Sequence, residues 1–329
     1  MNQKLILAPM ATLSHEAFRR CVAKFGGCDE YFNEMINAGS LIHQGPFEKY
    51  YLTSGPESEK MVWQLTGSRS DYMKTAAQIL AELPGLGVDI NMGCSAPQIA
   101  CTGAGIAWMT KPIAETEAMV KEVKSALEDS SKDGKTPPRL SVKLRLGGED
   151  FTEKGFFDFT DMLISEGVQS LTLHPRTQKE KLARNLPRYE YVEKLALRYP
   201  NIPVNLNGEV KDKNSLEFAL KKAPHAAGVM IGREAAKRPW IFAKLKGELP
   251  TEKVDMQQLA LDFIDDIEKF QPKEFFKTRL QRFFYYFCQN FDFANYFKVQ
   301  MLNSENNEDA RKRIKEYFKK QSEERFKTL

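Results

Sequence analysis

The chain has 329 residues, 42% of them hydrophobic and 28% charged, which is the range of folded globular proteins. No apolar run approaches the roughly 20 residues that span a bilayer, so a membrane-spanning segment is excluded. The five cysteines are odd in number and show no C-x-x-C spacing, which argues against a disulfide framework and against a zinc site. A cytoplasmic protein without a bound metal is expected.

The net charge of +4 is unevenly distributed along the chain. The last 59 residues, 271–329, hold 13 Lys and Arg against 8 Asp and Glu, whereas residues 1–270 hold 35 against 36. The positive excess therefore lies in the C-terminal segment, which indicates a polyanionic partner.

Short apolar runs alternate with longer amphipathic segments along most of the chain. The predicted strands are 5–9, 31–35, 61–65, 88–91, 140–145, 170–174, 203–207 and 228–232. Helices are predicted between and after them, with the second near 40–42 and the last over 235–245. Eight such units in about 245 residues predict a (β/α)8 TIM barrel. The first turn, APMATLS, has no glycine, which argues against a doubly wound dinucleotide-binding fold.

The segment after the barrel pattern contains helix-like stretches and no predicted strand. Fourteen of the chain's 36 aromatic residues lie in the last 59 positions, and most of these are expected to form the core of a small helical bundle. The chain is therefore predicted to have two domains, a TIM barrel over 1–245 and an all-helical domain over 246–329.

Functional side chains occur at nearly every predicted strand end, which is where TIM barrels build their active sites. These groups are Pro9–Met10, Glu34, Gln64, Asn91 with Cys94, Lys143 and Arg145, His174 and Arg176, Asn207–Gly208–Glu209, and Gly232–Arg233. A barrel that only had to fold could end its strands with any small polar residue. The pattern therefore predicts a ligand with many hydrogen-bonding edges.

Two of these strand ends suit a phosphate group. Gly208 and Gly232 follow the seventh and eighth strands, and glycine lets backbone N–H groups approach phosphate oxygens. Lys143 and His174 are expected to supply cations, and Gln64 can form a two-point contact with the edge of an isoalloxazine ring. Flavin mononucleotide (FMN) fits this set. Each residue also has a structural alternative, namely a salt bridge for Lys143, a loop cap for Gln64 and a packing role for His174.

Cys94 is the candidate for chemistry, because it follows the fourth strand in the glycine-rich loop NMGCSAPQIACTGAG. A thiol in such a loop can act as a nucleophile or as a proton donor. Cys101, in the same loop, is the alternative. The other three cysteines are expected to be small core residues.

These motifs together resemble those of the tRNA-dihydrouridine synthases. The resemblance is carried by LAPMATLSHEAFR, DINMGCSAPQIACTGAGIAWM, VKLRLG, HPRT, NLNGEV and GVMIGREAAKRPWIF, which occur in the family's order. It covers roughly residues 5–242. The chain departs from the family's usual residues at Ser95, Pro97, Gln98, Gly148, Pro175 and Leu182, and these departures bear on the uracil pocket.

The resemblance implies FMN bound without a covalent link, NADPH as its reductant, hydride transfer from flavin N5 to uracil C6, and Cys94 as the acid that protonates C5. It implies Asn91 at the target uracil or the flavin, with Arg145 and Arg176 expected beside it on the substrate side. The implied FMN contacts are Pro9, Met10, Ala11, Gln64, Lys143, His174, Asn207, Gly208, Glu209, Gly232 and Arg233.

The C-terminal segment resembles the family's helical tRNA-binding domain, with the C-type bacterial branch, which modifies position 16 of the D-loop, as the closest likeness. Lys273 and Lys277 are four residues apart and Arg279 and Arg282 three, so each pair can share a helix side and face phosphates. A monomer that binds tRNA is expected. The alternatives are a flavin barrel acting on a small molecule, of the dihydroorotate or enoate type, and a family member that only binds tRNA. The basic, aromatic tail favours a tRNA enzyme over a small-molecule enzyme.

Overall fold

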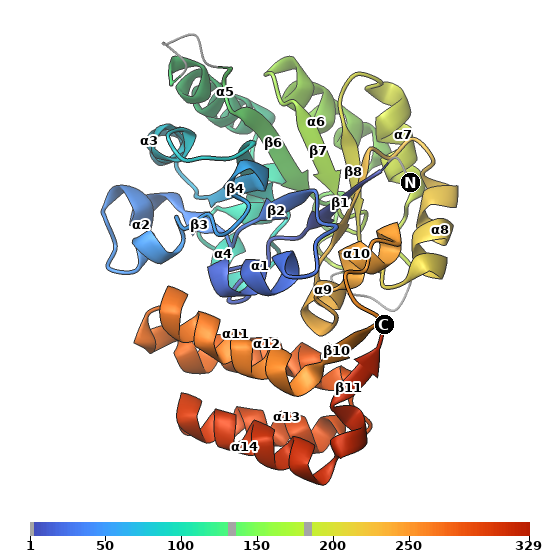
Figure 1. The fold of residues 1–329 in the computed structure, drawn as a ribbon. Coiled ribbons are helices and arrows are strands. Elements are labelled where there is room, and N and C mark those ends of the chain that lie inside the picture. The colour runs from blue at the N-terminus through green and yellow to red at the C-terminus, as the bar shows by residue number, and fades with distance from the viewer. Residues whose placement is uncertain (1–2, 131–135, 181–185) are drawn as a thin grey trace.

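The computed structural model describes residues 3–130, 136–180 and 186–329. Within them, parallel strands close into a barrel surrounded by helices, and a helical region lies beneath it (Figure 1). The barrel strands are β1 (Lys4–Leu7), β2 (Glu30–Phe32), β4 (Met61–Thr66), β5 (Gly87–Met92), β6 (Arg139–Leu144), β7 (Ser170–Leu173), β8 (Val204–Asn207) and β9 (Gly228–Ile231). The predicted TIM barrel is confirmed.

The barrel is closed by pairing between its first, second and last strands. β1 pairs with β9 on one side (Leu7 opposite Ile231) and with β2 on the other (Leu7 opposite Tyr31). β2 in turn pairs with β4, and the short β3 (Ile36–Asn37) extends the far end of β4. Seven of the eight runs lie within two residues of their predicted bounds, and β2 ends three residues before the predicted end at residue 35. The agreement follows because strands covered on both faces are apolar along almost their whole length.

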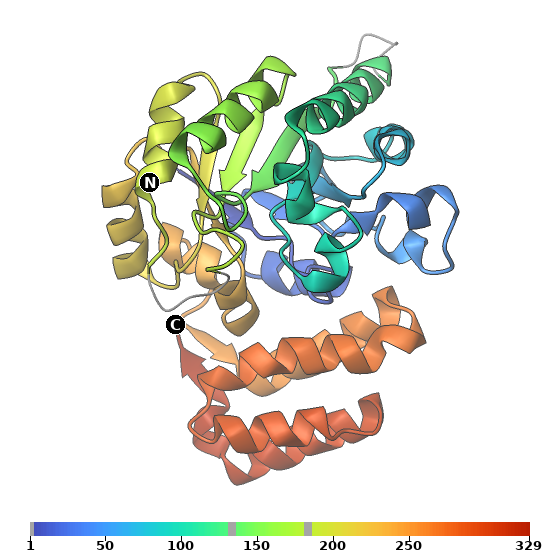
Figure 2. The same cartoon turned by 180° about the vertical axis from the view of Figure 1, so that it is seen from behind.

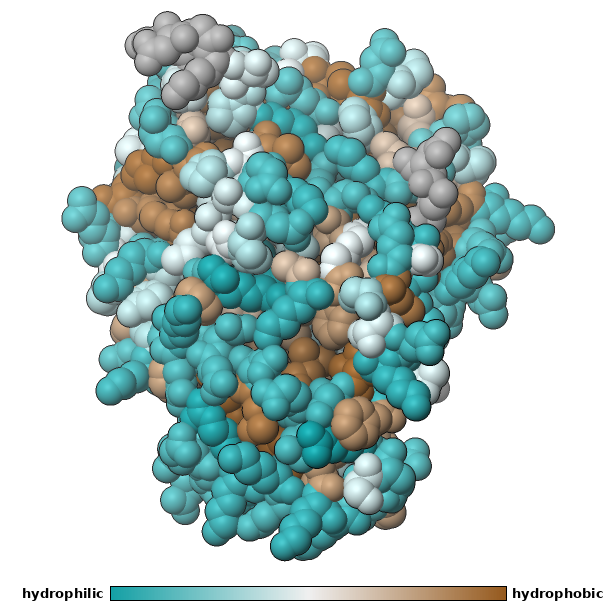
Figure 3. Space-filling model, viewed as in Figure 1, coloured by the Kyte–Doolittle hydropathy of each residue, from teal (hydrophilic) through white to brown (hydrophobic). Residues whose placement is uncertain are grey.

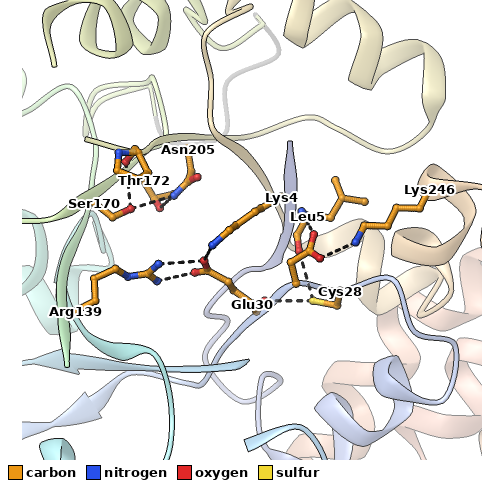
Figure 4. Close-up of polar contacts among 11 residues, drawn as sticks. Lys4, Leu5, Cys28, Glu30, Arg139, Ser170, Thr172, Asn205 and Lys246 are labelled. Atoms are coloured by element: carbon orange, nitrogen blue, oxygen red, sulfur yellow. Dashed lines mark hydrogen bonds and ion pairs between the residues drawn. The ribbon is translucent and has the colours of Figure 1, made fainter. Parts of the chain in front are cut away.

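A polar layer closes the barrel at the amino ends of its strands (Figure 4). Arg139 donates through both terminal nitrogens to Glu30, at 3.1 and 2.6 Å, and Lys4 donates to the same carboxylate at 2.9 Å. Nearby, Asn205 Nδ2 lies 3.4 Å from Ser170 Oγ. These groups pair with one another and lie opposite the end at which TIM barrels hold their ligands, so they are not part of the ligand site.

Helices cover the outside of the barrel, as the view from behind also shows (Figure 2). They are α1 (Glu16–Ala23), α2 (Ala38–Ile42), α3 (Ser70–Ala81), α5 (Ile113–Asp129), α6 (Glu153–Ser165), α7 (Glu190–Arg198), α8 (Lys213–Lys222), α9 (Arg233–Lys237) and α10 (Ile241–Lys246). The single helix predicted over 235–245 is wrong. It is interrupted at Pro239, which cannot donate a backbone hydrogen bond, and Arg238 before it leaves the helical conformation.

The C-terminal region consists mainly of four helices packed through aromatic rings. They are α11 (Met256–Phe270), α12 (Phe276–Phe287), α13 (Ala294–Leu302) and α14 (Asn307–Lys320). Phe263 and Phe283 stack with their ring centroids 3.7 Å apart, and Phe284 meets Phe297 edge-on at 5.8 Å. The outer face of α13 and α14 is mainly hydrophilic in Figure 3. The predicted aromatic core is therefore present.

The region also contains two short strands that the sequence pattern does not predict. β10 (Lys253–Asp255) pairs antiparallel with β11 (Phe326–Thr328), and Arg325 forms an ion pair with Asp255 at 2.7 Å. Three-residue strands are too short to show a period-two pattern. β10 and β11 pair because the two ends of the helical region, which contain these strands, lie side by side.

The helical region packs against the barrel on the side of the carboxyl ends of the strands. Lys24 of α1 forms an ion pair with Asp262 of α11 at 3.0 Å, and Asn290 donates to the carbonyl of Lys237 at 2.6 Å. Among the described residues, no helix is long and apolar enough to cross a membrane.

Candidate active site

A cavity of about 430 Å³ lies where the strands end and the helical region meets the barrel. It brings together most of the predicted cofactor residues, namely Pro9, Met10, Lys143, His174, Asn207, Gly208, Glu209, Gly232 and Arg233, together with Arg145. The cavity is also lined by side chains that were not among the predicted site residues, namely Lys211, Glu234, Lys237, Tyr286 and Gln289. Tyr286 belongs to α12, so the helical region forms part of the cavity wall. Ala11 is exposed in the loop after β1 and is not part of the lining.

Two glycines leave room where side chains would intrude on lining groups. A Cβ on Gly208 would lie 3.1 Å from the His174 ring, and the φ of +132° is one that other residues rarely adopt. A Cβ on Gly232 would lie 3.3 Å from the sulfur of Met10. Gly208 therefore requires glycine, and a side chain at Gly232 would press against Met10 in the cavity lining.

The cavity is positively charged overall. Its cationic lining side chains are Lys143, Arg145, Lys211, Arg233 and Lys237, and its carboxylates are Glu209 and Glu234. Glu209 is already paired, because it accepts from Arg233 at 2.8 Å and from Arg176 at 3.4 Å. The excess of cations suits an anionic ligand.

Lys143 and His174 lie close to other cations, and this changes their ionisation. Burial and the charge of Arg145 lower the pKa of Lys143 to about 8. Burial, reinforced by the charges of Arg145 and Lys143, lowers the pKa of His174 to about 2. The prediction that His174 supplies a cation is therefore wrong, because its ring stays neutral near pH 7.

The cysteine loop is held to the end of β5 by Asn91. The side-chain oxygen Oδ1 of Asn91 accepts from the backbone N–H of Cys94 at 2.9 Å and from that of Gly93 at 3.2 Å. Arg145 Nε donates to the Gly93 carbonyl at 2.9 Å. Cys94 is half-buried and is not itself part of the cavity lining, but its loop is bonded to a residue that is. Cys101 is exposed.

Gly105 allows this loop to turn closely over Cys94. The N–H of Ile106 donates to the Cys94 carbonyl at 3.0 Å, and Gly105 has a φ of +61°. A Cβ on Gly105 would lie 2.7 Å from the same carbonyl oxygen, closer than such atoms can approach. Only glycine fits this turn, which fixes the path of the loop around Cys94.

A chain of hydrogen bonds runs from the barrel interior to Asn91. Asn91 Nδ2 donates to Gln64 Oε1 at 2.9 Å, Gln64 Nε2 donates to Asp89 at 2.8 Å, and Ser141 Oγ donates to the other Asp89 oxygen at 2.8 Å. Since an ionised carboxylate only accepts, Asp89 fixes the orientation of the Gln64 amide and thereby that of Asn91. Burial raises the pKa of Asp89 to about 6, although the hydrogen bonds from Gln64 and Ser141 oppose the rise.

The side chain of Gln64 is not accessible for the predicted direct contact with a flavin edge in this structure. Gln64 is 0% exposed, and its amide lies between Asp89 and Asn91. Asp89 was not among the predicted site residues, although a carboxylate within the otherwise apolar run VDI was a signal that could have identified it.

The family model described as Dihydrouridine synthase matches residues 6–328 of the chain. The chain belongs to the dihydrouridine synthase family. It is 28% identical to a probable tRNA-dihydrouridine synthase of Staphylococcus aureus (strain COL), over 95% of this chain and 92% of that protein. It is 27% identical to probable tRNA-dihydrouridine synthase 2 of Bacillus subtilis (strain 168), over 96% and 94%.

Among solved structures, the old yellow enzyme homologue of Zymomonas mobilis aligns with a TM-score of 0.47 and 12% identity, over 76% of this chain and 90% of that one. This likeness adds nothing to the fold already described. The assignment to the dihydrouridine synthases depends on the sequence match.

The residues of this dihydrouridine synthase that were predicted to contact substrate do not share one environment. Lys273 and Lys277 are exposed and line the same surface pocket. Arg282 is exposed, but its Nε donates to the Thr12 hydroxyl at 3.1 Å. Arg176 is 3% exposed and pairs with Glu209, so it contributes to the cavity by holding a carboxylate that lines it.

Arg279 is the clearest correction among the predicted phosphate contacts. It is 3% exposed and forms an ion pair with Glu34 at 2.6 Å. The prediction that Arg279 and Arg282 together face phosphates is wrong, because the side of α12 that they share faces the barrel.

Proposed function

We propose that this chain reduces uridine to 5,6-dihydrouridine in the D-loop of tRNA, with FMN bound in the cavity and NADPH as the reductant. The observation that carries the proposal is a cationic, glycine-lined cavity next to the Cys94 loop, in a chain whose relatives are named probable tRNA-dihydrouridine synthases. A bound FMN would supply the hydride that adds to C6 of the uracil.

The cavity fits FMN in two respects, namely the hydrogen-bond donors that line it and the room that its glycines leave. Arg233 and the backbone next to Gly208 and Gly232 would hold the phosphate, since glycine leaves their N–H groups accessible. Lys143 would place a positive charge beside the flavin ring system, and neutral His174 would offer a hydrogen bond.

Cys94 would give its thiol proton to C5 of the uracil. Charge develops at C5 as C6 is reduced, and a positioned acid is needed to neutralise it. Asn91 fixes the backbone of Cys94, and Arg145 holds the preceding carbonyl. The loop thus sets the direction from which the proton arrives.

The function is tested by combining the purified protein with FMN, NADPH and unmodified tRNA, and by measuring dihydrouridine by mass spectrometry of the digested tRNA. The protein is expected to show flavin absorbance and to form dihydrouridine only when tRNA and NADPH are both present. Absence of bound flavin together with absence of product would contradict the proposal.

Replacing Lys143 by Ala is expected to weaken FMN binding by about tenfold, because one charge-assisted contact is lost. In the wild type, affinity should also fall as the pH rises above about 8, where the lysine loses its proton. This loss of affinity should begin at a somewhat higher pH when the ligand is an anion, since an anion favours the charged form of the lysine. FMN fluorescence titrations across the pH range measure both effects. Equal affinities and equal pH curves for the two proteins would exclude the contact.

Replacing Asp89 by Asn is expected to slow dihydrouridine formation by about tenfold, because the amide orientations that hold the Cys94 loop are no longer fixed. The wild-type rate should fall as the pH drops through about 6 and Asp89 gains a proton, whereas the variant should lack this limb. Ser141→Ala, which removes only the other hydrogen bond to Asp89, is the milder control. An unchanged acid limb in Asp89→Asn would show that another group causes it.

A further inference from the structure

Thr12 has an unusual backbone conformation in the loop between β1 and α1. Its φ is +61°, and a β-branched residue rarely adopts this left-handed conformation. The loop contains Pro9 and Met10, which line the cavity, and Met10 lies against Gly232, just after the neighbouring strand β9. Whatever holds Thr12 therefore also shapes one side of the cavity.

Glu34 and α12 hold Thr12. The N–H of Thr12 donates to Glu34 Oε1, and Arg279 of α12 donates to Glu34 Oε2 at 2.6 Å. Arg282, also on α12, donates to the Thr12 hydroxyl at 3.1 Å. Both oxygens of Glu34 are thus used to join the loop to the helix, and the Glu34 and Arg279 side chains are buried.

One face of α12 makes all of these contacts. Arg279, Arg282 and Tyr286 are spaced by three and four residues, so they lie on the same side of the helix. Tyr286 lines the cavity directly. Arg279 is held in turn by Phe275, whose ring centroid lies 4.9 Å from the guanidinium carbon.

We propose that Glu34 and Arg279 are positioning residues of the active site, which hold Thr12 in its left-handed conformation and so place Met10 at the cavity wall. The helical region then completes the cavity in addition to any contact with RNA. The inference rests on the proposed function for the identity of the ligand as FMN. The competing explanation is that this buried ion pair only stabilises the contact between barrel and helices.

Glu34→Gln tests the proposal, with two measurements on the full-length protein. It is expected to weaken FMN binding by about tenfold and to speed hydrogen–deuterium exchange of the amides from Met10 to Ser14. Adding Thr12→Gly should restore most of the FMN affinity, because glycine adopts the left-handed conformation without help. Thr12→Gly in the wild-type background is the reference. A role of Glu34 in stability alone predicts no rescue, and that result would overturn the proposal.

Arg282→Gln provides a second test that does not disturb the buried pair, since Arg282 is exposed. Loss of its bond to Thr12 should speed exchange of the same amides and weaken FMN binding, though less than Glu34→Gln does. Lys315→Gln on α14 removes an equal charge from an exposed position and is the matched control. Identical loop exchange in Arg282→Gln and Lys315→Gln would overturn the proposal even where Glu34→Gln does not fold. A wild-type protein that binds no flavin would contradict the proposed function, while loop exchange would still decide the positioning role.

Discussion

Replacing Cys94 by Ala is expected to abolish dihydrouridine formation, with a loss of at least about a hundredfold, while FMN binding and NADPH oxidation persist. Cys94 lies outside the cavity lining that would hold the flavin, so its removal should leave cofactor binding intact. In the proposed mechanism, Cys94 serves only the step in which C5 of the uracil receives a proton. Single-turnover reduction of tRNA by the pre-reduced enzyme isolates that step, and the rate of NADPH oxidation without tRNA reports the other.

Cys101→Ala is the matched control for Cys94→Ala, because it removes a thiol from the same loop. Cys101 is exposed, and the backbone hydrogen bonds that fix Cys94 do not involve it. Its replacement should leave the rate near that of the wild type. A Cys94→Ala variant that forms dihydrouridine at the wild-type rate would assign the proton to another group, with Cys101 the first to test.

Replacing Lys273 and Lys277 together by Gln is expected to weaken tRNA binding by about 30-fold at 0.1 M salt, with the difference vanishing near 1 M. Each phosphate contact contributes about 0.7–0.9 to the slope of log affinity against log salt, so two contacts change affinity by this amount over a decade of salt. Both lysines are exposed in one surface pocket and can meet neighbouring phosphates.

A salt series of tRNA binding measures this effect, and kcat at saturating tRNA should change less than the affinity, because phosphate contacts position the RNA without reading its bases. The double variant Lys312→Gln and Lys315→Gln, on the exposed side of α14, removes the same charge and is the control. Equal slopes of log affinity against log salt for the two double variants would show that the C-terminal segment contributes only its net charge and no specific phosphate contacts.

Both pairs of basic residues in the C-terminal segment were predicted from helical spacing, and the structure separates them. Spacing correctly places Arg279 and Arg282 on one side of α12. It could not show that this side packs against the barrel, because a basic residue beside a buried glutamate has the same sequence pattern as one facing phosphate. The strand ends were easier to predict, since the TIM barrel brings every carboxyl end to one face.

The sequence by itself determined the order of the strand–helix units, the aromatic core of the helical region and the set of residues at the carboxyl ends of the strands. Short apolar runs and helical periodicity are local properties, so they could be predicted without knowledge of distant contacts. The tertiary structure alone decided which individual polar groups are buried and which are charged. Arg279 is paired with Glu34, 245 residues away in the chain, and His174 stays neutral because folding buries it and places it beside Arg145 and Lys143. The free energy of a charge depends on burial and on neighbouring charges, and both come from segments that only folding brings together.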